Sequence, residues 1–260
     1  ASGAAATVGC IEVPVGEASA FGVMGVDERG WVEEFQEKPA APKSLPGRPD
    51  VALGSMGIYV FDRDFLIEAL TADAADTSSN HDFGRNLLPP LVRTRRVLAY
   101  AFRQAGGTSA YWRDVGTVDS YWQANMDLLD DEAALNLHDP EWPLWTHQPS
   151  RAPSRFTQHG SATCSIVAPG CTVAGRVHRS VLFAGSSVAT GSSVEGCLLL
   201  PDARIGRGCH LRNAIVDSSC VVPDGTVIDG DESPAATPLS ARGIALVTTE
   251  TLASPAGAFS

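Results

Sequence analysis

The chain has 260 residues, of which 44% are hydrophobic, and none of its apolar runs approaches the length of a membrane-spanning helix. Thirty acidic side chains outnumber nineteen basic ones, and the net charge of −11 argues against a general nucleic-acid or anionic-membrane surface. The six cysteines form no CxxC pair and no cluster at zinc-ligand spacing, which favours buried, reduced thiols in a cytoplasmic protein.

The first half of the chain alternates between strand-like and helix-like segments. Strands are predicted at residues 8–13, 21–26, 31–35, 56–61 and 97–102. A Pro-rich loop extends to about Pro49, and Asp62 is suited to cap a short helix that continues through Leu70. This mixture of elements predicts an α/β sheet domain.

The segment YWRDVGT, residues 111–117, leads into an amphipathic stretch in which the apolar residues are spaced by 4, 4 and 3. We predict a strand that ends at Asp114 and a helix that Thr117 caps. Ligands bind at the carboxyl ends of strands in α/β sheets, although many carboxylates at such positions only cap a helix or form a turn.

Five residues of the first half are candidates for chemistry, and most of them also have a purely structural interpretation. Lys38 offers a compact charge for a phosphate, or it is a surface lysine at a turn. Glu37 and Asp114 offer hard oxygen ligands for Mg²⁺. Ser55 either bonds a sugar hydroxyl or begins a strand, and Gly22 either admits a ligand close to the backbone or eases packing.

The amino-acid composition changes at residue 135. Residues 135–160 are rich in proline and contain Trp142 and Trp145, which predicts an ordered, extended linker with packed aromatic side chains. The preceding residues, 1–134, form the predicted sheet domain.

After the linker, apolar residues repeat every 17 residues in three separate series of positions, which we call registers. Apolar residues recur between Gly, Ser, Asp and Pro, as a parallel β-helix of hexapeptide repeats requires, with one coil per period and each register pointing inward. A sandwich of short strands is the alternative, but it gives no reason for one period in three registers. The β-helix is predicted at 161–230 and a tail at 231–260, with a possible last strand at 244–247. The registers are Cys164, Val181, Leu198 and Ile215; Cys171, Val188, Ile205 and Val222; and Val177, Val194, Leu211 and Ile228.

Two histidines lie within the repeats, His178 and His210. A β-helix acyltransferase would use such a histidine as a general base toward a hydroxyl or amine. Isolated histidines on polar corners are more often only solvated.

Motifs along nearly the whole chain resemble bacterial ADP-glucose pyrophosphorylase (glucose-1-phosphate adenylyltransferase). The motifs are EASAFGVM (17–24), EFQEKPA (34–40), GSMGIYVFD (54–62), HDFG (81–84), YWRDVGT (111–117), YWQANMDLL (121–129), NLHDPEWPLWT (136–146), SVLF (180–183), LLPDARIGRGCHLR (199–212) and VVPDGTVI (221–228). Several of them separate this family from other sugar-phosphate nucleotidyltransferases.

This resemblance implies an incomplete Rossmann-like nucleotidyltransferase sheet domain followed by a left-handed β-helix. It also implies transfer of AMP from ATP to glucose 1-phosphate, which yields ADP-glucose and pyrophosphate in glycogen synthesis. Lys38 would contact the sugar phosphate, Glu37 the sugar hydroxyls, and Asp114 would bind Mg²⁺. Gly22, Ser55 and Trp112 complete the residues that the resemblance places at the site.

The resemblance further implies a homotetramer with a sugar-phosphate activator and an AMP-type inhibitor. The family's activator site uses basic side chains near the C-terminus, for which the candidates are Arg207, Arg212 and Arg242. Two departures stand out earlier in the chain. Val15-Gly16 replaces the basic residue that usually follows EVP, and the Gly-rich phosphate loop of the GGxGxRLxPLT type does not occur, nor does the second metal-binding aspartate.

The leading hypothesis is therefore a fragment, or a separately encoded half, of the adenylyltransferase that has little activity alone. A second hypothesis is a non-catalytic regulatory subunit, in which the β-helix mediates assembly. The acyltransferase is third, because it leaves the EKP and WRDVGT motifs unexplained.

Overall fold

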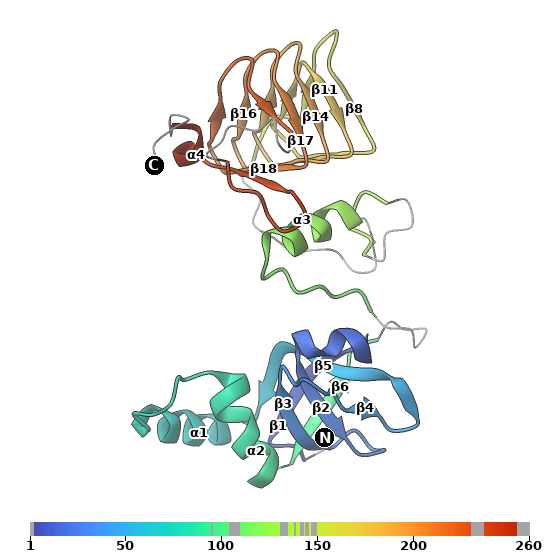
Figure 1. The fold of residues 1–260 in the computed structure, drawn as a ribbon, viewed down its shortest axis with the longest axis vertical. Coiled ribbons are helices and arrows are strands. Elements are labelled where there is room, and N and C mark those ends of the chain that lie inside the picture. Colours follow the sequence, from blue (N-terminus) through green and yellow to red (C-terminus); the bar gives the residue numbers. More distant parts are fainter. Residues whose placement is uncertain are drawn as a thin grey trace. The chain divides into compact units, whose positions relative to one another are not determined.

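The structure is a computed structural model that describes residues 3–94, 96–103, 110–130, 135–137, 139–140, 143, 146, 150–229 and 237–253. The chain divides into two compact units, Ala1–Trp112 and Arg113–Ser260 (Figure 1). Among the helices that the structure describes, none combines the length and the apolar composition needed to cross a membrane. Trp142 and Trp145 of the predicted linker lie outside the described residues.

A mixed sheet forms the centre of the first unit, with strand order β3-β2-β5-β1-β6 and β4 paired to β5. All of its pairs are antiparallel except β1 with β6. The five predicted strands are present, and β5 begins eight residues earlier than predicted because its first half pairs with the end of β1. The strands are β1 (Ala6–Pro14), β2 (Gly22–Val26), β3 (Val32–Glu37), β4 (Ser44–Leu45), β5 (Arg48–Phe61) and β6 (Val97–Ala101).

Helices cover the sheet of this unit. The core of one face joins Leu88 and Leu91 of α2 to Val8, Leu53 and Val97 of the strands. The predicted cap at the start of α1 is confirmed, since the Asp62 carboxylate accepts a hydrogen bond from the Phe65 amide. The helical elements are η1 (Val15–Ala20), α1 (Arg63–Ala75), η2 (Phe83–Leu87) and α2 (Leu88–Thr94).

The second unit begins with the segment that contains Asp114. The predicted helix is present as α3 (Val118–Asp127), and Thr117 caps it in a reciprocal capping box with Ser120. The predicted strand is wrong, because residues 110–117 form none. Asp114 instead accepts a hydrogen bond from the Gly116 amide at 3.2 Å, a local turn that competes with strand pairing.

Three five-stranded parallel sheets form the coils of a β-helix, shown in Figure 1. Its first strand lies within the predicted linker and its last within the predicted tail, where a strand at 244–247 was expected. One sheet contains β7 (Arg155–Phe156), β10 (Thr172–Val173), β13 (Ser187–Val188), β16 (Arg204–Ile205) and β19 (Val221–Val222). The second contains β8 (Ser161–Thr163), β11 (Arg176–His178), β14 (Ser193–Glu195), β17 (His210–Arg212) and β20 (Val227–Ile228). The third contains β9 (Ile166–Val167), β12 (Val181–Leu182), β15 (Leu198–Leu199), β18 (Ala214–Val216) and β21 (Ala245–Val247), and α4 (Thr249–Ala253) follows.

The predicted period of 17 residues holds in most coils, but it is two residues shorter in one and longer in the last, where Ala214 pairs with Ala245. The turn between β10 and β11 contains residues 174–175, whereas the corresponding turn between β13 and β14 contains residues 189–192. Gly175 permits this short turn, because a Cβ atom there would lie 2.5 Å from the carbonyl oxygen of Ser192. Val188 is consequently paired with Val173 rather than Cys171, and Val181 with Ile166 rather than Cys164.

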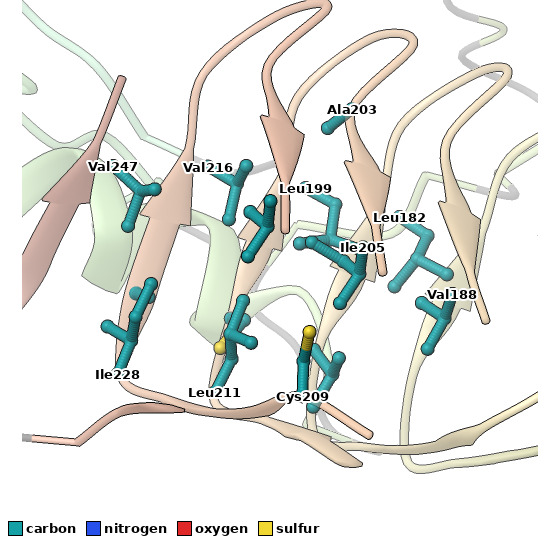
Figure 2. Packing of buried hydrophobic residues seen from close by; sticks show 14 of the residues in the cluster. Leu182, Val188, Leu199, Ala203, Ile205, Cys209, Leu211, Val216, Ile228 and Val247 are labelled. Atoms are coloured by element: carbon teal, nitrogen blue, oxygen red, sulfur yellow. The ribbon is translucent and has the colours of Figure 1, made fainter. Parts of the chain in front are cut away.

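Side chains of two of the three predicted registers point into the coils, as predicted. The buried cluster inside the coils includes Val188, Ile205, Leu211 and Ile228 (Figure 2). The register of Val181, Leu198 and Ile215 instead belongs to a separate cluster with α3, and the neighbouring residues Leu182, Leu199 and Val216 point inward. Adjacent residues of a strand face opposite sides of the sheet. The outward-facing residues of this sheet are apolar as well, because α3 covers them.

All six cysteines are free, and all except Cys164 are buried. Cys164 was expected to face the core, but it is exposed and has a φ of 49°. Burial raises the pKa of Cys10 and Cys197 to about 12, although backbone hydrogen bonds act in the opposite direction. These two thiols are therefore unreactive near neutral pH.

Candidate functional site

The candidate site lies where β2 begins and β3 ends, beside the middle of the neighbouring strand β5. Gly22, the first residue of β2, is paired with Glu37, the last residue of β3. The next residue, Lys38, donates its backbone N–H to the carbonyl oxygen of Phe21 at 3.0 Å. Lys38 has a φ of 47°, which is uncommon for a residue with a side chain. The end of β3 therefore presents an exposed carboxylate and an exposed ammonium group in succession.

Ser55 reaches the same place from β5. Val23 of β2 is paired with Gly54, so the next residue of the antiparallel strand, Ser55, lies beside Gly22. The structure thus brings together four of the predicted site residues, Gly22, Glu37, Lys38 and Ser55.

Two glycines, Gly22 and Gly84, lie close to the Glu37 carboxylate. A Cβ atom on Gly22 would lie 2.6 Å from Cζ of Phe35 and 3.0 Å from Oε2 of Glu37. A Cβ atom on Gly84, in η2, would lie 2.9 Å from the same Oε2. Larger side chains at either glycine would therefore displace the carboxylate or its neighbours.

Tyr59 and Phe83 form an aromatic wall beside these groups. Their rings stack with centroids 5.4 Å apart and an interplanar angle of 13°. Burial is the main cause that raises the pKa of Tyr59, a hydrogen bond from Ser55 opposes it, and the charges of Glu37 and Asp82 raise it further. Tyr59 therefore remains a neutral phenol, which can both donate and accept hydrogen bonds.

Residue-by-residue reasoning missed Tyr59, Asp82, Phe83 and Gly84. The signal available was their presence in the GSMGIYVFD and HDFG motifs, since nothing in local spacing places residues 82–84 beside Glu37. Trp112, which was predicted, lies near the start of β2, with its ring centroid 6.0 Å from that of Phe21.

Asp114 belongs to the second unit, where its carboxylate is exposed. Within the described part of the chain, no group of three or more His, Cys, Asp or Glu residues is arranged to hold a metal ion. A single exposed carboxylate suits a hard cation that takes one or two protein oxygens and completes its shell with water and substrate phosphates, as Mg²⁺ does.

The candidate histidines and arginines of the β-helix lie on its polar outer surface. Nδ1 of His178 lies 3.0 Å from the Thr163 hydroxyl, and Nδ1 of His210 lies 2.9 Å from the Ser193 hydroxyl. Arg207 lies in the turn after β16 and Arg242 in the turn before β21. The third arginine pairs with two carboxylates: the contacts are Arg212–Asp229 at 3.2 Å and Arg212–Glu195 at 3.9 Å.

Two family models match the chain. Residues 1–131 match the model described as nucleotidyl transferase, and residues 151–247 match the model described as GlmU-like, C-terminal hexapeptide. These matches confirm the predicted fold, a nucleotidyltransferase sheet domain followed by a left-handed parallel β-helix.

Curated relatives resemble nearly the whole chain. A glucose-1-phosphate adenylyltransferase of Thiobacillus denitrificans is 50% identical over 95% of this chain and 58% of its own length. Glucose-1-phosphate adenylyltransferase 2 of Alkalilimnicola ehrlichii is 48% identical over 96% of this chain and 61% of its own length. The corresponding protein of Bradyrhizobium diazoefficiens is 45% identical over 88% and 57%. The chain therefore spans about three fifths of these relatives, and the predicted resemblance is confirmed.

Proposed function

The chain belongs to the nucleotidyl transferase family, and from this premise we propose that its sheet unit binds glucose 1-phosphate for adenylyl transfer from ATP. The observation that carries the proposal is the meeting of Gly22, Glu37, Lys38 and Ser55 where β2 begins and β3 ends, beside the middle of β5. The names of the relatives support the choice of sugar phosphate and nucleotide.

Each side chain has a distinct part in the proposed site. The Lys38 ammonium group binds the phosphate of the sugar, and the Glu37 carboxylate accepts hydrogen bonds from its hydroxyls. A phosphate oxygen of the sugar attacks the α-phosphate of ATP, and pyrophosphate leaves, so no covalent intermediate with the protein is needed. Lys38 holds the attacking group in place and stabilises its charge.

Mg²⁺ is the proposed metal, with Asp114 as its ligand from this chain. When bound, the cation neutralises phosphate charge as it develops during the transfer. We assign the nucleotide contacts to the part of the relatives' sequence that this chain does not span. The family resemblance also supports a cytoplasmic homotetramer with a sugar-phosphate activator, for which Arg207, Arg212 and Arg242 are proposed contacts, and an AMP-type inhibitor.

Titration calorimetry with glucose 1-phosphate tests the proposal on the chain itself. We expect saturable binding that Lys38→Ala weakens by about tenfold or more, because a charged hydrogen bond to the phosphate is lost. Lys43→Ala is the matched control, since Lys43 is the only other lysine and pairs with Glu34 at 3.5 Å. Failure of the wild-type chain to bind, or equal affinity in the Lys38 variant, would contradict the proposal.

Adenylyl transfer itself is tested by joining the chain to the portion of one of its relatives that this chain does not span. Pyrophosphate release should then require both ATP and glucose 1-phosphate. Absence of that activity in the rebuilt enzyme would reject the assignment of the reaction.

A further inference from the structure

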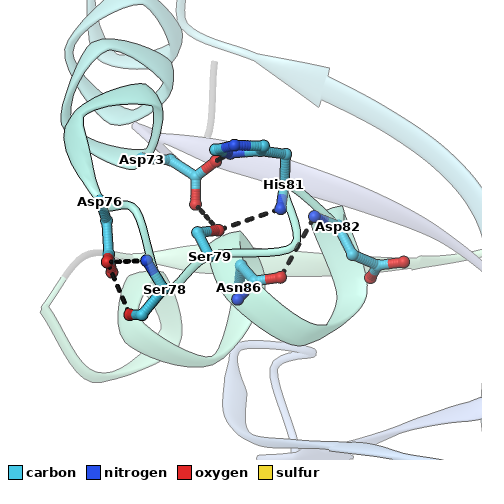
Figure 3. A network of polar contacts seen from close by, with 7 residues as sticks. All are labelled: Asp73, Asp76, Ser78, Ser79, His81, Asp82 and Asn86. Carbon is cyan, nitrogen blue, oxygen red and sulfur yellow. Dashed lines mark hydrogen bonds and ion pairs between the residues drawn. The ribbon is translucent and has the colours of Figure 1, made fainter.

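A network of polar contacts holds the loop between α1 and η2 (Figure 3). At its centre is Asp73, which lies in α1 and whose side chain is only 11% exposed. One carboxylate oxygen accepts a hydrogen bond from the Ser79 hydroxyl at 2.6 Å, and the other lies 2.7 Å from Nδ1 of His81. The His81 amide donates to the Ser79 hydroxyl oxygen at 3.0 Å, which closes the network.

The network fixes an unusual backbone conformation. His81 has a φ of 56°, in the left-handed region that residues with side chains seldom adopt. Such a conformation persists where surrounding contacts determine it, and the Asp73–His81 contact joins the ring to the preceding helix. The direction in which the chain leaves His81 is consequently set by Asp73 and Ser79.

Residues 82–84 follow directly and form one wall of the candidate site. Asp82 caps η2, because its carboxylate accepts a hydrogen bond from the Arg85 amide at 2.8 Å. Phe83 stacks on Tyr59, and Gly84 lies against the Glu37 carboxylate. A shift of this segment would therefore change both the aromatic wall and the surroundings of Glu37.

We propose that Asp73, Ser79 and His81 are positioning residues of the sugar-phosphate site. They hold residues 82–84 against Glu37 without contacting the ligand themselves, and so they set the affinity for the sugar. This inference rests on the proposed function. It adds residues of α1 and of the following loop to those that determine sugar binding.

Asp73→Ala is the principal test, and Asp76→Ala is its matched control. Asp76 also accepts two hydrogen bonds, from the amide and the hydroxyl of Ser78 at 2.9 and 2.6 Å, but both bonds remain inside the loop. We expect Asp73→Ala to weaken glucose 1-phosphate binding by about tenfold, and Asp76→Ala to change it by less than about twofold. Hydrogen exchange should accelerate at the amides of Arg85 and Asn86 in the first variant only.

Substitutions of His81 separate local positioning from general stability. His81→Asn retains a side-chain donor and tolerates the left-handed conformation, so it should bind within about threefold of the wild-type chain. His81→Val has neither property and should lose affinity as Asp73→Ala does. The melting temperatures of all variants show whether a variant is folded at the temperature of the titration.

The outcomes distinguish this inference from the proposed function. If the wild-type chain binds and Asp73→Ala binds equally well, or if Asp76→Ala loses as much affinity, only the positioning role is overturned. If the wild-type chain does not bind, the proposed function fails and the positioning role fails with it.

Discussion

Gly22 is a residue at which the shape of the site can be tested directly. Gly22→Ala places a methyl group 2.6 Å from Cζ of Phe35 and 3.0 Å from Oε2 of Glu37, so at least one of these side chains must move. We expect a loss of about 1–3 kcal/mol in unfolding free energy and weaker glucose 1-phosphate binding. Denaturant unfolding and calorimetry measure the two effects. Gly16→Ala is the control, because a Cβ atom there meets no atom within 4 Å, and it should change neither quantity.

Glu12 should make the stability of the first unit depend on pH. Burial raises the pKa of Glu12, but hydrogen bonds from Arg103 and Arg48 outweigh this effect and hold the pKa below its ordinary value. A carboxyl group with a lowered pKa stabilises the fold above its unfolded pKa, and the stabilisation is lost as the pH falls through the folded pKa. Glu12→Gln should therefore be about 1–3 kcal/mol less stable than the wild-type chain at pH 7, and the difference should shrink at pH 3. A difference that is constant with pH would contradict this linkage.

Single residues differ in how far the sequence specifies their role. Glu37 and Lys38 are adjacent in a motif, so their presence at one site could be predicted. The part played by Gly84 could not, because it depends on a segment held by a side-chain contact to Asp73 in the preceding helix and by stacking on the more distant Tyr59. The spacing of residues along the chain does not predict such side-chain contacts.

At the scale of elements, α3 provides an outer cover for the β-helix. The side chain of Met126 is fully buried against Val181, Leu198 and Ile215, and the Trp122 indole donates a hydrogen bond to the carbonyl oxygen of Gly196 at 2.7 Å. α3 is therefore an integral part of the second unit's core.

Shortening Met126 tests this packing. Met126→Ala should cost about 2–5 kcal/mol in unfolding free energy, through lost apolar burial and the cavity that remains. Met126→Leu nearly conserves the volume and should cost less than about 1.5 kcal/mol. Denaturant unfolding followed by circular dichroism measures both. Similar, small losses in the two variants would show that α3 is not firmly packed on the coils.

The same helix explains which parts of the β-helix were predictable. The 17-residue period predicted the coils, because stacking forces equivalent residues into register. It did not reveal which of two adjacent apolar residues, Val181 or Leu182, faces inward, because α3 makes the outer face apolar as well. The shortened turn at Gly175 was also missed, since deleting two residues there leaves the later registers intact.

At the scale of the whole molecule, each compact unit has a core of its own. The cluster around Val8, Leu88 and Val97 lies in the first unit, and the clusters inside the coils and beneath α3 lie in the second. Most coil contacts join residues about 17 apart in sequence, whereas the sheet of the first unit pairs β1 with the distant β6. Domains with separate cores commonly unfold as separate cooperative units.

Two unfolding transitions are therefore expected in scanning calorimetry of the chain, and two variants assign them. Gly22→Ala should lower the midpoint of one transition and leave the other unchanged, because its strain is confined to the sheet. Met126→Ala should lower only the other midpoint, because its cavity opens between α3 and the coils. A single transition that both variants lower by the same amount would show that the two units unfold as one. Loss of sugar-phosphate binding on heating should follow the transition that Gly22→Ala lowers, since Glu37, Lys38 and Ser55 all lie in the first unit.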